Sequence, residues 1–448
     1  MPIDRRYLLT GSLASAALAV RPALATAIPV AGIPADEFGV RADSHDDQSA
    51  ALQRAIDAAA QRNVPLWLAP GNYRAGGLRL PNGSQLAGAR GATRIVSTGA
   101  QPLLASTHSE SISLSGVVLD GAGIPLAKGG GVVQFLDVHK LIMRDCAIVK
   151  AGGNGIALER CDGEVTRTRI TGADDNALFC RDGRGMQIVG NNIRDSGNGG
   201  IRVWQGEKRP DGSVIADNVI DDTHARDGGT GQNGNAINVF RAANVMVRGN
   251  RIRNAAFSAI RGNSASHIQI IANDCTACDE VAIYSEFDFE SAVIAENVIG
   301  DAANGISVTN FKEGGRLASV HGNILRNLRA RGTDATADAF GIGIAVEADT
   351  IVNGNVVENA QNAGISAGWG PYLRNVAVTA NVLHQCGIGV TVSVAPGAGN
   401  ALIANNLIVG ASRGAIRGME WQKTVTGDLA RGGGDRFPQL NISGNQVS

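Results

Sequence analysis

An asparagine followed two positions later by an aliphatic residue recurs through the second part of this chain. The markers are Asn191, Asn218, Asn250, Asn273, Asn297, Asn323, Asn355, Asn381, Asn406 and Asn445, of which Asn273 is followed by Cys275 instead. Their spacings are 27, 32, 23, 24, 26, 32, 26, 25 and 39 residues. Thr168 and Asp145 extend the register toward the amino terminus without the asparagine. Repetition at such a period indicates a chain built from stacked, similar units.

A short strand recurs between the markers. Segments such as Gly155–Leu158, Gly200–Val203 and Gly305–Val308 alternate apolar with variable residues, which is the pattern of a strand with one buried face. The segments between strands are too short for crossover helices, which excludes a doubly wound sheet. Coiling the chain so that each strand pairs with its counterpart one turn later satisfies the backbone groups except at the two ends. The sequence therefore predicts an all-β fold, a right-handed parallel β-helix, in which the asparagine amides bond from turn to turn.

The amino-terminal part of the body differs from the repeats. Asp46 and Asp47 precede a segment whose apolar face is Leu52, Ile56 and Ala59, the pattern of a capped amphipathic helix. A helix over one open end of the coil stack removes the exposed sheet edge there. We therefore expect an N-terminal capping helix.

Residues 1–27 are predicted to be a targeting segment. Arg5 and Arg6 precede a weakly apolar, alanine-rich stretch, and small-x-small cleavage sites follow at 23–25 or 25–27. This pattern resembles the bacterial twin-arginine signal, which implies passage through the twin-arginine translocase to the periplasm or to secretion. An ordinary secretory signal is the alternative and delivers the chain to the same compartment. The rest is expected to be one domain over 28–448, with the cap and first coils at 28–125, regular coils at 126–420 and a last coil or cap at 421–448.

Composition limits the partners of the chain. Lys and Arg number 40 against 41 Asp and Glu, whereas a nucleic-acid binder would carry a basic surplus. No apolar run in the mature chain reaches the roughly 18 residues of a membrane span. The 59 glycines and 4% aromatics suit a narrow, regular interior. Cys275 and Cys278 are expected to be buried or locally bridged, because their context is a strand and turn.

Four segments near the start of the mature chain resemble the opening of the pectate-lyase superfamily of carbohydrate-active β-helices. They are 38–40 (Phe-Gly-Val), 46–47 (Asp-Asp), 50–53 (Ala-Ala-Leu-Gln) and 70–73 (Pro-Gly-Asn-Tyr). The later repeats look like those of twin-arginine-translocated repeat proteins of uncharacterised function. Together the resemblances cover nearly all of the mature chain. They imply a β-helix body and, if the chain is an enzyme, catalysis on the outer face of one strand ladder.

Two columns of outward residues follow if the isoleucine of each strand, or its equivalent, points inward. One column lies one residue after that position, and the other lies three residues after it. Toward the ends the columns are mostly small or neutral, as at Leu178 and Cys180. The middle four coils carry Arg202, Asn238, Arg261 and Tyr284 in the first column and Trp204, Phe240, Asn263 and Glu286 in the second. At about 4.8 Å per coil this cluster spans roughly 15 Å, the length of a few sugar units.

The chemistry of these residues suits an acidic polysaccharide. Arg202 and Arg261 can bind uronate carboxylates. Lyases and C5-epimerases neutralise that carboxylate and then remove the adjacent proton, for which Tyr284, its pKa lowered by a neighbouring Arg, or Glu286 are candidate bases. His224 is a candidate mobile acid or base. Predicted substrate-binding residues are Trp204, Asn238, Phe240, Asn263 and Asp288, and Lys208 and Arg209 are expected to wall the cleft.

We therefore expect an exported carbohydrate-active protein of lyase or C5-epimerase type. Hydrolysis would need two carboxylates, for which Glu286 with Asp288 or Glu347 are available. A non-catalytic periplasmic repeat protein that binds a cofactor or metal, a structural polysaccharide-binding protein, and a merely solvated sheet face are the alternatives. No cofactor and no metal site are predicted, with calcium kept as an alternative. Scattered histidines and five methionines are poor material for copper or zinc.

Overall fold

The computed structural model describes residues 32–448 except 230, 310–314 and 331–339. The expected targeting segment at residues 1–27 lies outside the described residues. Residues 32–448 form one compact unit.

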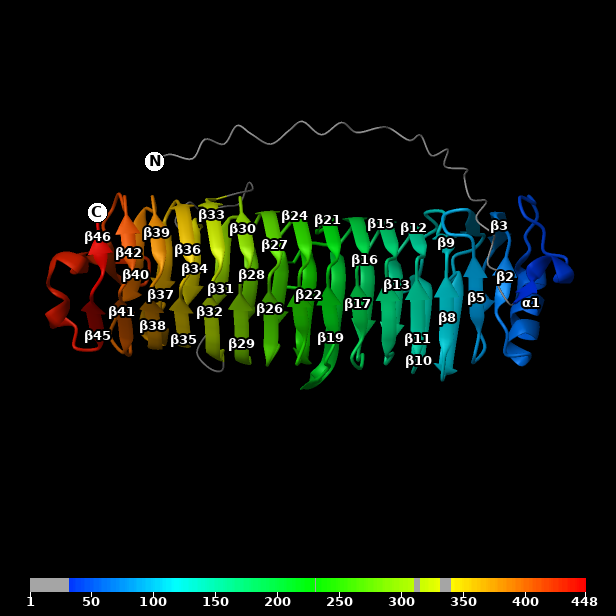
Figure 1. Cartoon of the computed structure of the whole chain (residues 1–448), viewed down its shortest axis with the longest axis horizontal. Helices are drawn as coiled ribbons and strands as arrows, with labels where there is room; N and C mark the ends of the chain where they lie inside the picture. Colours follow the sequence, from blue (N-terminus) through cyan, green and yellow to red (C-terminus); the bar gives the residue numbers. More distant parts are fainter. Residues whose placement is uncertain (1–31, 230, 310–314, 331–339) are drawn as a thin grey trace, which may run out of the picture. The chain divides into compact units, whose positions relative to one another are not determined.

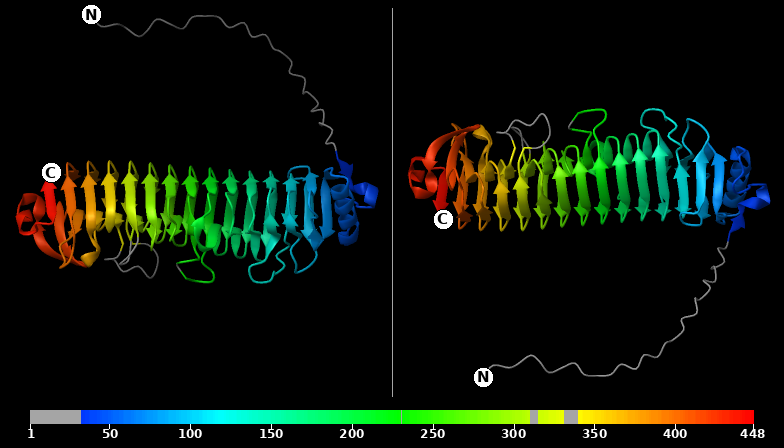
Figure 2. Two further views of the ribbon diagram at one scale, coloured as in Figure 1. Left: turned by 90° about the horizontal axis from the view of Figure 1, so that it is seen from below. Right: turned by 90° about the horizontal axis from the view of Figure 1, so that it is seen from above.

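This unit is a right-handed parallel β-helix with three sheets, as predicted (Figure 1). Sheet A has 16 strands, from β1 (Ile33–Pro34) to β45 (Leu440–Ser443). Sheet B has 15 strands, from β3 (Gly71–Ala75) to β46 (Gln446–Val447), and sheet C has 15, from β4 (Leu78–Arg79) to β44 (Lys423–Asp428). Among the described strands every pairing is parallel except that of β43 (Ile416–Glu420) with β44, which closes sheet C with a hairpin. Figure 2 shows that the long connections project from one side of the stack.

Sheet C carries the candidate site on its outer face. Its middle strands are β10 (Gly131–Val138), β13 (Asn154–Glu159), β16 (Asn176–Arg181), β19 (Gly199–Pro210), β22 (Asn235–Ala243), β25 (Ile260–Asn263), β28 (Val281–Glu286), β31 (Asn304–Val308), β34 (Ile342–Val346), β37 (Ala363–Ala367) and β40 (Ile388–Ser393).

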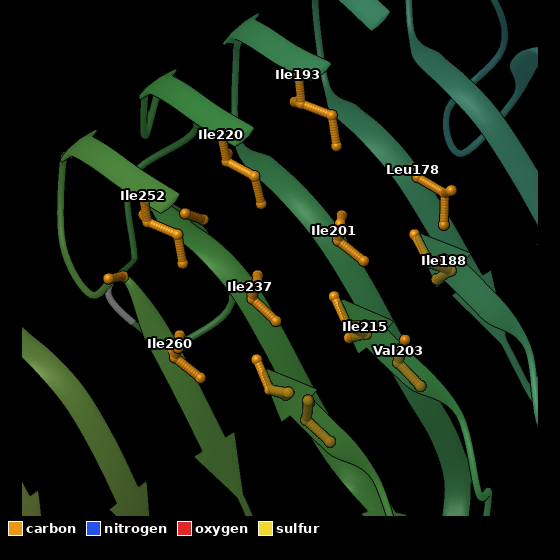
Figure 3. Packing of buried hydrophobic residues seen from close by; sticks show 14 of the residues in the cluster. Leu178, Ile188, Ile193, Ile201, Val203, Ile215, Ile220, Ile237, Ile252 and Ile260 are labelled. Carbon is orange, nitrogen blue, oxygen red and sulfur yellow. The ribbon is translucent and has the colours of Figure 1, made fainter. Parts of the chain in front are cut away.

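Columns of stacked aliphatic side chains fill the interior (Figure 3). Sheet B contributes Ile193, Ile220 and Ile252, sheet C contributes Leu178, Ile201, Ile237 and Ile260, and sheet A contributes Ile188 and Ile215, all of them fully buried. Each such side chain contributes about 1.5–3 kcal/mol by leaving water. Because the same residue type recurs one coil later, the core continues without a break along the stack.

The asparagine markers form a ladder at the turn between sheets A and B, as predicted. Asn273 donates both its backbone N–H and its Nδ2 to Oδ1 of Asn297, each at 3.0 Å. The same pair of bonds joins each of the other neighbouring markers from Asn191 to Asn445. The asparagines therefore have a structural role.

The ladder changes residue type in the earlier coils. Thr168 keeps the register by donating its backbone N–H to Asn191. The equivalent position one coil earlier is Cys146, because Ala147 pairs with Arg169, so the prediction of Asp145 is wrong by one residue. That coil has no asparagine to mark the phase of the turn.

The predicted capping helix is α1 (Ser49–Gln61), which lies at the amino-terminal end of the stack (Figure 1). Leu52, Ile56 and Ala59 are buried as predicted. The N-cap residue is Gln48, whose side chain does not cap the helix, and Oδ1 of the preceding Asp47 accepts the N–H of Ser49 at 2.8 Å. Within the described residues, no helix has the length and apolar character needed to cross a membrane.

All six cysteines are buried and unbridged. This confirms the buried alternative for Cys275 and Cys278. Burial raises the pKa of the Cys275 thiol well above its usual range, so this thiol stays protonated at neutral pH.

Candidate functional site

The eight residues of the two predicted columns lie on adjacent strands of sheet C in the expected register. In the first column Arg202 pairs with Asn238, Asn238 with Arg261, and Arg261 with Tyr284. In the second column Trp204 pairs with Phe240, Phe240 with Asn263, and Asn263 with Glu286. The strands that carry them are β19, β22, β25 and β28.

The preceding strand, β16, is shifted by one residue from the prediction. Leu178 pairs with Ile201, and both Leu178 and Cys180 point into the core instead of outward. The outward residues are Phe179 and Arg181, which pair with Arg202 and Trp204. The sequence of this coil offers apolar residues in both phases, and the larger Leu178 displaces Ala177 from the inward position. Phe179 therefore joins the site, which the sequence prediction missed.

An aromatic row runs along the coil stack and consists of Phe179, Trp204 and Phe240. The ring centroids are 5.3 Å apart for Phe179 and Trp204, with planes at 78°, and 5.4 Å apart for Trp204 and Phe240, with planes at 59°. All three side chains are half-buried. Nε1 of Trp204 donates to Oδ1 of Asn238 at 2.9 Å and holds the middle ring in place. The row thus presents one fixed aromatic ring per coil.

Arginines flank the aromatic row. The guanidinium of Arg241 lies 4.8 Å from the ring centroid of Phe240, and Arg241 is exposed. Arg181 is also exposed and pairs with Glu159 of the previous coil at 2.6 Å. The guanidinium of Arg202 lies 5.2 Å from the ring centroid of Trp204. Cations at these distances interact favourably with the ring faces.

Arg202 differs from the other two because a loop covers it. It is only 6% exposed, and its Nη2 donates to Oδ1 of Asn233 at 2.6 Å. Burial lowers the pKa of Arg202 to about 10. The same loop covers Asn238, whose Nδ2 donates to the carbonyl of Gly231 at 3.0 Å. A uronate carboxylate would have to displace this loop to reach Arg202.

A buried cluster of charged side chains follows the aromatic row. Arg261 donates its Nε to Oε1 of Glu286 at 2.7 Å and its Nη1 to Oε2 of Glu280 at 3.2 Å. Its guanidinium lies 4.8 Å from the ring centroid of Tyr284. Asn263 Nδ2 donates to the same oxygen of Glu286 at 2.8 Å. We call Glu280, Arg261, Glu286 and Tyr284 the carboxylate–arginine cluster.

Two groups of this cluster hold their protons more tightly than usual. Burial, reinforced by the charge of Glu286, raises the pKa of Tyr284 to about 12, although Arg261 opposes this shift. The predicted lowering of this pKa is therefore wrong, because burial and the charge of Glu286 outweigh the effect of Arg261. Burial also raises the pKa of Glu280, against the effects of Arg261 and Ser258. Glu280 escaped the sequence prediction because it lies in the turn before β28, outside the strand columns.

The remaining predicted residues lie outside the two columns of sheet C. His224 follows β21 (Val219–Thr223) of sheet B, and its Nε2 lies 3.2 Å from Oδ1 of Asp195. This contact is on sheet B and does not involve the two columns on sheet C. Lys208, on the long end of β19, forms an ion pair with Asp288, which follows β28. This ion pair spans the strands β22 and β25, which lie between β19 and β28 in sheet C. Arg209 pairs with Asp182 at 3.1 Å.

A hollow of about 340 Å³ continues the aromatic row toward the amino terminus. Its lining includes Lys128, Gln134, Glu159, Phe179 and Arg181. Phe179 and Arg181 belong both to this hollow and to the row or its flank. The surface available to an extended ligand therefore covers the outer faces of at least five consecutive strands, β10 to β22.

The carboxylates do not suit hydrolysis. Glu286 and Glu347 lie two coils apart on sheet C, which corresponds to roughly 10 Å and slightly exceeds the separation used by inverting glycosidases. Both are almost completely buried. Asp288 already forms an ion pair with Lys208. The structure therefore gives no support to the hydrolytic alternative.

The fold and site define a right-handed parallel β-helix protein with an aromatic and charged outer face. Residues 138–335 match the model of a family described as "Periplasmic copper-binding protein (NosD)". None of the curated proteins matches the chain.

Several solved structures are similar to this chain. The N-terminal fragment of bacteriophage phi29 gene product 12 has 14% identity and a TM-score of 0.60, over 88% of this chain and 74% of that one. The pre-mature form of the same protein has 13% identity and a TM-score of 0.59, over 88% and 58%. The A-module of Azotobacter vinelandii mannuronan C-5 epimerase AlgE6 has 14% identity and a TM-score of 0.48, over 93% and 99%. The two phage structures support the fold alone.

The side chains in the described part of the chain do not fit the copper named by the matched family. Among the described residues, no group of three or more His, Cys, Asp and Glu could hold a metal ion. The cysteines are buried, and the fully buried Met143 and Met186 lie in different coils. Soft sulfur ligands, which copper(I) prefers, are therefore not gathered at a surface site in the described part of the chain.

Proposed function

We propose that this protein is exported and binds an acidic polysaccharide along the outer face of sheet C. The aromatic row carries the proposal. Its three half-exposed rings repeat once per coil, at 5.3 and 5.4 Å, along the direction in which an extended sugar chain would lie. Aromatic rings stack on the apolar faces of pyranoses, and rings fixed beforehand lose little freedom on binding.

The charge around the row supports an acidic ligand. Arg181, Arg241 and Lys208 are exposed beside it. Arginine recognises carboxylates in a planar, bidentate manner. Each of these cations has a bond within the protein, to Glu159, to the carbonyl of Gly206 and to Asp288 respectively. The exposed positions allow a uronate carboxylate to compete for them.

Export to the periplasm or beyond is part of this proposal. The twin-arginine-like segment at residues 1–27 and the match of residues 138–335 to a family described as periplasmic support it. The twin-arginine translocase would be a partner only during export.

Lyase or C5-epimerase activity is a second candidate function. The observation that favours it is the pair of raised pKa values at Glu280 and Tyr284 on either side of Arg261. In this scheme the Glu280 carboxylate accepts the C5 proton of a uronate. Tyr284, which carries its proton at neutral pH, donates a proton either to C5 from the other face or to the departing O4. These roles replace the sequence prediction of Tyr284 as base.

The experiment is a calorimetric titration of the mature protein with alginate, pectate, glucuronan and hyaluronan. We expect binding that weakens with added salt, because charge contributes, and that weakens further in Trp204→Ala. Trp67→Ala, which removes a half-buried tryptophan from β2 (Leu66–Leu68) of sheet A, is the matched control. Failure to bind any of the four polymers would contradict the proposal.

Catalysis is tested on the same samples. Ultraviolet absorbance reports unsaturated uronates, and proton NMR reports epimerisation. Turnover that is lost in both Glu280→Gln and Tyr284→Phe, with binding retained, would support the second candidate. Binding without turnover would remove it and leave a polysaccharide-binding protein.

A further inference from the structure

A second group of aromatic side chains lies near the carboxy-terminal end of sheet C. Trp369 and Tyr372 belong to the connection after β37, which contains the short helix η2 (Gly370–Tyr372), and Trp421 lies at the tip of the β43–β44 hairpin. The ring centroid of Trp421 is 5.8 Å from that of Trp369 and 6.3 Å from that of Tyr372. Trp369 is 39% exposed and Trp421 is 48% exposed.

Trp369 and Trp421 border a hollow of about 140 Å³ over the outer face of β37 and β40. Its lining includes the small residues Ser366, Gly368 and Thr391. Arg413, in the connection before β43, also lines it, and its Nη2 donates to the carbonyl and Oδ1 of Asn362 at 2.8 and 3.0 Å. An aromatic wall, a polar lining of small residues and an exposed arginine thus meet in one cavity.

The aromatic wall is held in place before any ligand binds. Ser393 Oγ donates to the carbonyl of Gly370 at 2.7 Å and fixes η2 over the sheet. Trp421 packs so closely on Gly370 that a Cβ there would lie 2.6 Å from its ring. Trp421 has a φ of +55° at the tip of the hairpin, a conformation that many turn residues of the coil stack share, and its ring is half exposed.

We propose that this hollow is a second subsite for an acidic pyranose unit, which stacks on the tryptophans and directs its carboxylate to Arg413. The inference rests on the proposed function of the aromatic row. Six strand steps separate β22 from β40 within sheet C, which corresponds to about 29 Å. A polysaccharide chain that lies along the sheet therefore occupies both sites at once, and the linkage increases its affinity over that of either site.

The test is calorimetric titration of the folded protein with uronate disaccharides and with long chains from alginate and pectate. We expect two disaccharides to bind per protein chain, and only one in Trp421→Asn or in Trp204→Ala. For long chains each substitution weakens binding by roughly 100-fold or more, because linked binding is lost. Asparagine is chosen at position 421 because it tolerates a positive φ, and Trp369→Ala is the second variant if Trp421→Asn does not fold. Trp67→Ala is the control for a tryptophan outside both sites.

The outcomes separate the two proposals. Stoichiometry that stays unchanged in Trp421→Asn and Trp369→Ala, with binding lost in Trp204→Ala, would overturn the second subsite and leave the aromatic row. Loss of disaccharide binding in the Trp421 and Trp369 variants alone would support the carboxy-terminal subsite and contradict the role of the aromatic row. A lack of binding to either probe in the unmodified protein would overturn both.

Discussion

Arg261 and Glu286, on neighbouring strands of sheet C, form an ion pair at 2.7 Å in which the two residues are 5% and 1% exposed. Glu280 contacts the same guanidinium from the turn before β28. One cation therefore serves two carboxylates in a place with little water, and the stability of this part of the stack depends on it.

Removing the arginine should destabilise the fold strongly. Arg261→Met leaves two carboxylates without their cation, and breaking a buried pair from one side costs about 3–5 kcal/mol. Denaturant unfolding measures the loss. The matched control is Arg226→Met, which breaks a pair with Asp174 in which both side chains are exposed and should cost less than about 1 kcal/mol. Equal losses in the two variants would contradict this account.

Substitution of an asparagine in the middle of the ladder should destabilise the fold more than substitution at its end. Oδ1 of Asn297 accepts two bonds from Asn273, and its Nδ2 donates to Asn323 and to the carbonyl of Ile270. Asn297→Ala leaves several buried groups unpaired, at about 1–3 kcal/mol for each, so we expect a clear fall in the unfolding midpoint. Asn445→Ala, at the last coil, should cost much less because the end of a repeat stack frays on its own. A similar loss at both positions would argue against the ladder as the cause.

The repeat predicted the fold because the asparagines and strand isoleucines mark the phase of each coil independently. The same phase predicted the register of Arg202, Trp204, Arg261 and Glu286 correctly. It failed at β16, where Leu178 and Ala177 compete for the inward position, and at Asp145, where no asparagine marks the turn. The phase of a coil can be derived only where its sequence carries a marker.

The electrostatics of the site could not be derived from the columns. Burial of Arg202 depends on Asn233, which belongs to a connection whose path the repeat does not predict. The raised pKa of Tyr284 depends on burial and on Glu286, two influences that outweigh the neighbouring arginine. The strand register shows which charged residues are neighbours. The loss of water around each of them depends on the loops, whose paths the repeat does not predict.

Stability should depend on pH through Glu280. Its folded pKa is raised above the ordinary value of 4.5, so its favourable contribution is complete below that value and is lost as pH rises through the folded pKa. Glu280→Gln removes this ionisation. The stability of the variant relative to the unmodified protein should therefore increase from about pH 4 toward neutrality, as measured by thermal unfolding across that range. A difference that is flat with pH would contradict the assignment.

The cysteine thiols should be unreactive in the folded protein. All six cysteines are buried, and burial raises the pKa of Cys146 and Cys161 to about 11. Because the thiolate is the reactive form, we expect no reaction with Ellman's reagent in buffer and six equivalents in denaturant. Rapid reaction of any cysteine in the native state would show an opening of the coil stack.

Copper should not stabilise the protein. The described residues offer no cluster of His, Cys, Asp and Glu that could hold the ion, and a ligand raises stability only by binding the folded state. We expect the melting temperature to be the same with copper(I), with copper(II) and with a chelator. A copper-dependent rise in melting temperature would favour the metal-binding alternative.

The central claim is that the aromatic row binds an acidic polysaccharide, and the affinity of Phe179→Ala/Trp204→Ala/Phe240→Ala for alginate and pectate tests it most directly. Because the triple variant removes all three stacking rings, it should bind both polymers about 100-fold more weakly or worse, through the carboxy-terminal subsite alone. Trp67→Ala should bind normally, and circular dichroism should show the β-helix intact in both. Unchanged affinity in a folded triple variant would contradict the account.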